Sequence, residues 1–448
     1  MALIDKASLL MVPSTYEAGT LYNVLPSGNR APDSTDQNSG YDQTRADFTF
    51  DRGSNAAATR IGSDGLIKKY RENLYTQSNN FSHSDWSPKA GTFTQGVEDP
   101  NGGTDAWSWT ATNTDPYLYQ NKNLSGVHCL SIYVKGVGST IGEDFQIRVG
   151  AALKDVALTG DWQRVQHFGV LSGSTNIGFE YGNPATANDV VHIYAAQLEV
   201  GTIATDVLTS GATTAKAGVL IDLPRINYDA NGENGALLLE PSRQQLFQYS
   251  EYATGWSTSN TGITIEENAT TSPEGVNNAA KIKEDGTNAA HAVRQLTGPT
   301  LTSGTDYTFS FFAKKGERSI VALSNTIGAS NDANCFFDLE NGQVLTNQFN
   351  SASIEDFGNG WFRCIVTDTA DAADDYDTRI YTATADNQFS HQGVSGSGLY
   401  IFGLQLETGS YPTSYIPTYG TSQTRSNDSC LATSVSDVIG QTDGTMFF

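Results

Sequence analysis

An internal repeat is the feature that most constrains how this chain can fold. Similar segments occur twice in the same order, and the offset between the two occurrences grows steadily from 172 to 208 residues. The clearest pair is residues 193–201 (IYAAQLEVG) and residues 401–409 (IFGLQLETG). Chance rarely preserves such an order, so the sequence predicts two copies of one domain, over residues 71–206 and 243–418.

Other segment pairs support the repeat, and they also locate an insertion in the second copy. The pairs are residues 71–78 with 243–250, Trp86 with Trp256, 131–136 with 310–316, and 160–164 with 359–363. The offset grows most between the last two pairs, which places about 20 extra residues between Gly316 and Trp361. Within that insertion Asn341 and Gly342 lie between apolar runs. An Asn-Gly pair tolerates positive φ and predicts a β-hairpin there.

Strand patterns dominate both copies. Residues 145–149 (FQIRV) and 307–311 (YTFSF) alternate apolar and polar side chains, which is the period of a strand with one buried face. Clusters of Gly, Asn, Asp and Ser interrupt these runs at short intervals. Short strands at such spacing, in units of this length, indicate an all-β protein built from two tandem jelly-roll or β-sandwich modules.

Three segments remain outside the two copies. Residues 1–70 are expected to form an irregular N-terminal anchor, and residues 207–242 a linker whose apolar stretch at 236–239 docks on a neighbour. Residues 419–448 end on a strand-like start, Thr-Met-Phe-Phe. We expect them to lead into a further β domain that continues beyond residue 448.

Composition limits the possible partners and compartment. The chain has 26 basic and 49 acidic residues, a net charge of −23, which disfavours binding to a phosphate backbone. It contains no 18-residue apolar run, so no membrane insertion is expected, and its first residues lack the pattern of a signal peptide. The four cysteines show no C-x-x-C spacing, which favours free thiols over a zinc site or disulfides.

Two segments carry a resemblance to a known family. Residues 73–81 (NLYTQSNNF), followed by Trp86, and residues 400–418 (YIFGLQLETGSYPTSYIPT) resemble the opening and closing elements of a module repeated in tailed-bacteriophage fibre and spike proteins. Residues 435–445 (VSDVIGQTDGT) resemble the lead-in to a concanavalin-like domain that often follows in this family.

The resemblance implies a structural protein of the virion, in the form of a head fibre, a tail fibre or a minor tail protein. Its modules would be carbohydrate-binding-like jelly rolls, displayed on the particle surface for host attachment. Residues 1–70 would bind other virion proteins, such as capsid, portal or tail components, and the assembly is expected to be a homotrimer.

Two other functions stay open. The chain could be an adhesin whose modules bind host cell-surface glycans directly. It could also belong to a depolymerase whose catalytic domain lies beyond residue 448. Neither an H-E-x-x-H pair nor a G-x-S-x-G elbow occurs, so we predict no catalytic residues in this chain.

Aromatic side chains are the candidates for contact with ligands and partners. Trp107 and Trp109 alternate on one strand and are candidate sugar platforms, although core packing is the preferred interpretation for both. Trp107 is the better candidate, because its counterpart in the second copy is the small residue Ala280. Candidate contacts to the virion or to neighbouring subunits are Leu21, Tyr22, Tyr411 and Tyr415.

One acidic loop is a candidate metal site, and no other cofactor is expected. It contains Asp371, Asp374, Asp375 and Asp377. Clustered carboxylates suit Ca²⁺, so a structural calcium ion is a hypothesis here. A solvated acidic turn is the alternative, and the preferred one.

Overall fold

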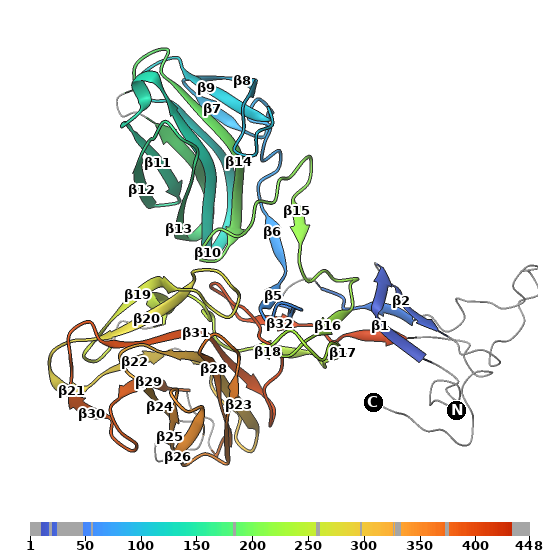
Figure 1. The fold of residues 1–448 in the computed structure, drawn as a ribbon, viewed down its shortest axis with the longest axis vertical. Helices are drawn as coiled ribbons and strands as arrows, with labels where there is room; N and C mark the ends of the chain where they lie inside the picture. Colours follow the sequence, from blue (N-terminus) through green and yellow to red (C-terminus); the bar gives the residue numbers. More distant parts are fainter. Residues whose placement is uncertain are drawn as a thin grey trace, which may run out of the picture.

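The computed structural model describes residues 10–17, 20–24, 48–54, 57–181, 185–256, 260–295, 298–325, 327, 333–371 and 376–431. Within these ranges the chain is almost entirely β, and its helical turns are two short ones, η2 (Gly138–Thr140) and η3 (Ala253–Gly255). The predicted all-β fold with two tandem modules is confirmed. Figure 1 shows the two modules as separate bodies beside a set of short strands. In the described ranges, no helix is long and apolar enough to span a membrane.

The first module is one sheet with the order β12-β11-β13-β10-β14-β9-β8, and β7 pairs at one end of β10. Its strands are β7 (Ser87–Lys89), β8 (Gly91–Val97), β9 (Ala106–Ala111), β10 (Tyr117–Val137), β11 (Asp144–Val149), β12 (Ala152–Ala157), β13 (Gln163–Tyr181) and β14 (Val190–Val200). The long strands β10 and β13 pair continuously, from Tyr117 with Glu180 to Val134 with Gln163. Leu118 from one end of β10 and Ile132 from the other share one core, so the sheet closes on itself as a sandwich.

The second module repeats this strand order with its long strands interrupted. Its sheets are β19-β20-β31-β23-β28-β27 and β22-β29-β24-β25-β26. The bounds are β19 (Ile263–Thr270), β20 (Ala279–Glu284), β21 (Asn288–Ala290), β22 (Ala292–Gln295), β23 (Asp306–Lys315), β24 (Ile320–Asn325), β25 (Ala333–Asp338), β26 (Gln343–Asn347), β27 (Ser351–Asp356), β28 (Trp361–Thr369), β29 (Thr378–Ala383), β30 (Ser390–Gln392) and β31 (Gly398–Thr408). The pair β22 and β23 corresponds to β10, and the pair β28 and β29 to β13.

The predicted insertion supplies β26 and β27, because β24 and β25 stand where β11 and β12 stand in the first module. Strand β26 forms a hairpin with β25. Asp338 pairs with Gln343 across the turn, and Gly342 has φ of 62°. A residue with a side chain would be strained in that conformation, which explains the Asn-Gly signal. The hairpin prediction is confirmed.

Equivalent polar residues close both modules in the same way. In the first module the amide of Gln197 donates to Glu199 at 2.7 Å, and Glu199 accepts from the backbone N–H and the hydroxyl of Thr205 at 2.8 and 2.7 Å. In the second, Gln405, Glu407 and Thr413 make the same three bonds at 2.6, 2.8 and 2.6 Å. Buried carboxylates are stable only when hydrogen-bonded in this way. The repeat therefore extends to the hydrogen bonds of the core.

Short strands outside the modules form a third unit, here called the collar, of residues 48–73, 207–245 and 419–431 (Figure 1). Its strands are β3 (Phe48–Asp51), β4 (Thr59–Ile61), β5 (Ile67–Lys69), β6 (Arg71–Asn73), β15 (Ala215–Ala217), β16 (Arg225–Asn227), β17 (Ala236–Leu238), β18 (Arg243–Gln245), β32 (Gln423–Arg425) and β33 (Ser429–Leu431). The pairs are β4 with β5, β6 with β15, β16 with β17 and β18 with β32. A four-stranded sheet joins β1 (Leu10–Glu17), β2 (Thr20–Val24), β3 and β33.

The strands outside the modules correct two predictions and leave a third standing. The N-terminal segment is not irregular where it is described, because it contributes β1 to β5. The linker pairs with β6 through β15 and forms the pair of β16 and β17, which agrees with a docked segment. Residues 423–431 return to β18 and β3 and do not start a separate sheet, whereas residues 432–448 lie outside the described ranges.

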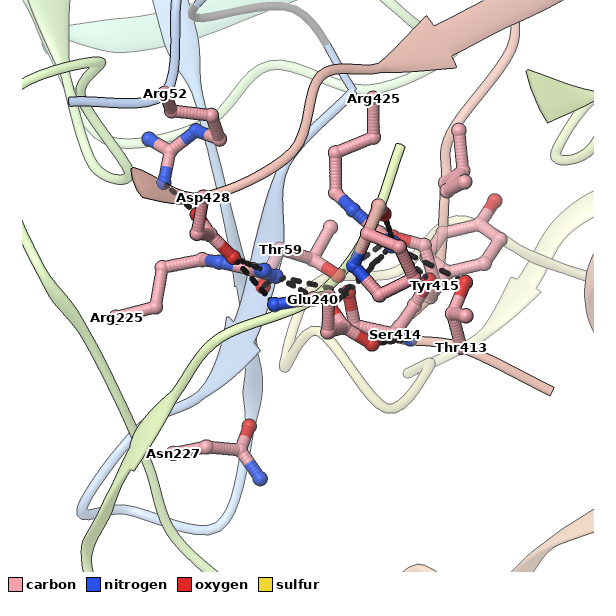
Figure 2. A network of polar contacts seen from close by, with 12 residues as sticks. Arg52, Thr59, Arg225, Asn227, Glu240, Thr413, Ser414, Tyr415, Arg425 and Asp428 are labelled. Carbon is pink, nitrogen blue, oxygen red and sulfur yellow. Dashed lines mark hydrogen bonds and ion pairs between the residues drawn. The ribbon is translucent and has the colours of Figure 1, made fainter. Parts of the chain in front are cut away.

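A buried ion network joins the collar strands (Figure 2). Asp428 pairs with Arg52 at 3.3 Å and also contacts Arg225. Glu240 pairs with Arg225 at 2.8 Å and with Arg425 at 3.3 Å. Desolvated charges of this kind persist only when opposite charges and hydrogen bonds surround them. The network therefore ties the N-terminal segment, the linker and the C-terminal segment into one unit.

Candidate functional site

The clearest candidate site is an open sheet face on the first module. In the first half of β10 the side chain of Leu118 is fully buried, so Tyr117 and Tyr119 point to the opposite face and are half-buried. Their rings are stacked, with centroids 4.9 Å apart and an angle of 27° between the planes. Stacked rings cover part of each other's faces, and the faces and edges that they leave uncovered add apolar area to this side of the sheet.

Neighbouring strands add space and polar groups beside this pair. Gly178 on β13 lies opposite Tyr119, and a Cβ there would come within 2.7 Å of the Cα of Tyr119. On β11 the Arg148 guanidinium lies 5.5 Å from the ring centroid of Tyr117 and donates to Gln146 at 3.2 Å. We call this surface the tyrosine face, comprising Tyr117, Tyr119, Asn121, Gln146, Arg148, Asn176 and Glu180.

Burial controls the ionisation of Tyr117. Desolvation raises the pKa of this phenol to about 12; Arg148 acts in the opposite direction, and Glu180 raises it further. The hydroxyl therefore stays protonated at physiological pH. The hydroxyl oxygen is buried and has no hydrogen-bond partner among the residues that the structure describes.

Amide side chains extend the tyrosine face along the sheet. The Asn121 amide donates to Asn176 at 2.8 Å and accepts from the Ser174 hydroxyl at 2.7 Å. On the other side Gln146 donates to Asp155 at 2.9 Å. Arg148 and Glu180 approach to 3.7 Å. Aromatic rings flanked by fixed hydrogen-bond donors and acceptors suit a ligand that has both apolar surface and hydroxyl groups. These side chains are therefore arranged to bind such a ligand.

The equivalent face of the second module is closed. There Ala292 on β22 takes the place of a tyrosine and pairs with Tyr381 on β29. The ring of Phe389 covers this face, with its centroid 4.6 Å from that of Tyr381 and 4.9 Å from that of Phe336. These side chains form an apolar cluster of their own. The two copies therefore share a core but differ in this face.

The tryptophans proposed as sugar platforms lie in the core. Trp107 is 6% exposed and donates from its indole N–H to the Asn79 carbonyl at 2.8 Å. Trp109 is fully buried, stacks on Phe93 at 5.5 Å and meets Tyr181 edge-on at 4.7 Å. Neither ring offers a free face to a sugar. The platform hypothesis is wrong for both, and the preferred core interpretation holds.

The candidate contact residues have different surroundings. Tyr415 is 3% exposed and shares a hydrogen bond of 2.7 Å with Ser250, so it packs within its own chain and cannot reach a neighbouring subunit. Tyr411 is 50% exposed, with the Arg243 guanidinium 5.5 Å from its ring, and it stays a candidate contact. Leu21 and Tyr22 lie on β2, whose side chains are outside the described part of the structure.

The acidic loop does not present a calcium site in its described part. Asp377 receives hydrogen bonds from Arg294 at 2.6 Å and from Arg379 at 3.1 Å, and these cations lower the pKa of its carboxyl. A carboxylate that faces two guanidinium groups is already neutralised. Asp371 is exposed, and Asp374 and Asp375 lie outside the described residues. No group of three potential metal ligands occurs among the residues described.

The sequence reasoning missed the tyrosine face although a signal was present. Residues 117–121 read YLYQN, an alternation that places two tyrosines and an asparagine on one side of a strand. What the pattern could not show is that this side is the outer one. That depends on the pairing of β10 with β13, which brings Arg148 and Glu180 to the same surface.

No family model and no curated protein sequence matches the chain. Among solved structures, it is similar to the N-terminal CBM22-1–CBM22-2 tandem domain of Paenibacillus barcinonensis Xyn10C, with a TM-score of 0.26 and 13% identity over 80% of this chain and 100% of that one. It is also similar to the M60 catalytic domain with the CBM51-1 and CBM51-2 domains of Clostridium perfringens ZmpB, with a TM-score of 0.19 and 10% identity over 75% of this chain and 39% of that one. TM-scores this low do not establish a shared fold.

Proposed function

We propose that this chain is a non-catalytic attachment protein that binds host-surface carbohydrate through the tyrosine face of its first module. The observation that carries the proposal is the stacked pair Tyr117 and Tyr119, with Arg148 beside it. A sugar ring has an apolar face that packs on aromatic rings and hydroxyl groups that need fixed hydrogen-bond partners. The tyrosine face offers both on a preformed sheet.

A glycan array probed with the whole chain tests this proposal. We expect binding to a limited set of glycans, and Tyr119→Ala should weaken it at least about tenfold, because about 1.4 kcal/mol of stacking would be lost. Tyr411→Ala is the matched control, since Tyr411 is a half-exposed tyrosine on the other module. No glycan binding, or equal losses in both variants, would reject the tyrosine face as the site.

A second proposal concerns the setting, a bacteriophage virion. The resemblance of residues 73–81 and 400–418 to fibre and spike modules supports it. The sheet of β1, β2, β3 and β33 also supports it, because this sheet lies apart from both modules and is a suitable mount for a particle (Figure 1). The chain would then be a head or tail fibre, or a spike, bound to capsid, portal or tail components and assembled as a homotrimer.

Immunogold labelling of intact particles and mass photometry of the purified chain test the setting. We expect labels on the particle surface and a mass of three chains. A stable monomer at micromolar concentration would contradict the trimer, and unlabelled particles would contradict the virion location. The depolymerase alternative requires a catalytic domain beyond residue 448, and the described residues neither support nor oppose it.

A further inference from the structure

A cleft of about 400 Å³ lies between the collar and the outer face of the second module. Its volume is within the range of pockets that take small ligands. The collar contributes β4, β5, the end of β16 with the turn after it, and part of β17. The module contributes β23, β28 and the end of β27 with the turn after it. Residues 412–415 close one side, and Figure 2 shows several of the lining side chains. The cleft is separate from the tyrosine face, which lies on the other module.

Aromatic rings form the apolar part of this cleft. Phe312 is fully buried, and Phe357 meets it edge-on with centroids 4.9 Å apart and remains half-exposed. Tyr228 contributes a half-exposed ring from the collar side, held against Gly235, where a Cβ would come within 2.5 Å of that ring. The cleft therefore has a ring on each of its two walls.

A buried cation with an unused donor also lines the cleft. Arg363 is 6% exposed and donates to the Ser310 hydroxyl at 3.0 Å and to the Thr413 carbonyl at 2.9 Å. Its Nε has no hydrogen-bond partner among the residues that the structure describes. A buried donor without a partner is unfavourable, and a ligand oxygen that reached it would remove that penalty.

The charges of the cleft do not favour an anion. Arg60 and Arg363 line the cleft together with Glu355 and Asp356, which are exposed. Glu240 is already neutralised by the collar arginines, and the Asp229 carboxylate accepts the backbone N–H groups of its own turn. With no excess of positive charge, a carboxylate or phosphate ligand has no electrostatic advantage.

We propose that this cleft binds a neutral saccharide unit, independently of the tyrosine face. The unit's ring packs between Phe357 and Tyr228. One ring hydroxyl accepts from the free Nε of Arg363, and others donate to the carboxylates of Glu355 and Asp356. Hydroxyl groups that donate and accept, on a ring with an apolar face, match this set of groups. Because the site joins collar and module, its occupant also bridges the two units.

Saturation-transfer NMR on the whole chain, with maltose, cellobiose and lactose as probes, tests this site. We expect transfer to at least one disaccharide, and Phe357→Ala should weaken its binding about tenfold. The exposed-residue variant Glu355→Gln/Asp356→Asn should weaken it similarly, because each loses a charge-assisted hydrogen bond, and it does not endanger folding. Glu143→Gln removes an exposed carboxylate of the first module, away from both sites, so it is the matched control for the loss of charge and should leave this binding unchanged.

Other outcomes overturn the proposal. If none of the three sugars binds, the cleft is not a saccharide site. If only Tyr119→Ala removes their binding, the sugars bind at the tyrosine face and the cleft is again not a saccharide site. Stronger binding of 3′-sialyllactose than of lactose through Phe357 would point to an anion site. Displacement of the sugars by tri-lysine, lost in the Glu355→Gln/Asp356→Asn variant, would point to a cationic peptide ligand.

Discussion

The side chains of Arg225 and Asp428 form an ion pair in which neither is exposed to solvent, although 203 residues separate them in the sequence. The same carboxylate pairs with Arg52 and accepts the backbone N–H of Glu240 at 3.0 Å. One side chain from the C-terminal segment therefore satisfies groups from the N-terminal segment and from the linker. Burial lowers the pKa of Arg52, and the Asp428 carboxylate acts against that shift.

The first prediction is that Asp428→Asn loosens the collar. Loss of the Asp428 charge leaves Arg52 and Arg225 buried with one fewer counter-charge, so we expect the free energy of unfolding to fall by about 3–5 kcal/mol. Urea denaturation followed by circular dichroism measures this change. Asp64→Asn is the control, since Asp64 pairs with Lys68 on the surface and should change stability by less than about 1 kcal/mol. A similar small effect of both variants would mean that the network is not stabilising.

The second prediction concerns acid stability and Glu284. Hydrogen bonds from Arg318, Thr382 and His391 outweigh desolvation and lower the pKa of this buried carboxyl to about 2. Because the folded pKa lies below the unfolded value of 4.5, the stabilisation is complete above that value and is lost as the pH falls towards 2.

Urea midpoints at pH 7, 4 and 2.5 measure this dependence. Glu284→Gln should lower stability at pH 7 by about 3–5 kcal/mol, because Arg318 loses its counter-charge, and should flatten the decline towards acid pH. Glu143→Gln, at an exposed position, is the control and should keep the wild-type profile. An unchanged acid decline in Glu284→Gln would show that other groups cause it.

The repeat made the modules predictable, since one strand order had to serve both copies. The offset of 208 residues between 193–201 and 401–409 also sets Thr205 against Thr413. The structure gives these two threonines the same role, since Thr205 binds Glu199 as Thr413 binds Glu407.

The collar could not be predicted in the same way. Its strands β18 and β32 have three residues each, too few for a period to appear, and their pairing joins residues 243–245 to 423–425. Buried arginines such as Arg225 also look like surface residues in a sequence. The collar forms one wall of the cleft, so the sequence could not predict the cleft either.

The third prediction follows from the burial of Trp107. Trp107→Ala should lower the free energy of unfolding by about 3–5 kcal/mol, because it removes a core ring that contacts Phe81 edge-on at 6.2 Å. Thermal unfolding by circular dichroism measures the loss, with Tyr119→Ala, at a half-buried position, as the milder control. Loss of glycan binding in Trp107→Ala without loss of stability would instead restore this residue as a sugar platform.

The last prediction uses a bulge that both modules share. In β14, Ala195 and Ala196 lie opposite Ile132, and in β31, Gly403 and Leu404 lie opposite Phe311. Each bulge has one residue with positive φ, which is 51° at Ala195 and 63° at Gly403. The same backbone is therefore built with a strained alanine in one copy and with a glycine in the other.

Exchanging these two residues should have unequal effects. Gly403→Ala should destabilise the chain by at least about 2 kcal/mol, because the positive φ is unfavourable for alanine and its Cβ would come within 2.9 Å of the Phe312 ring. Ala195→Gly should change stability by less than about 1 kcal/mol, since relief of strain offsets the lost methyl group and the greater freedom of the unfolded chain. Urea denaturation of both variants measures the difference. Equal losses would show that the two bulges are not equivalent in energy, although their geometry matches.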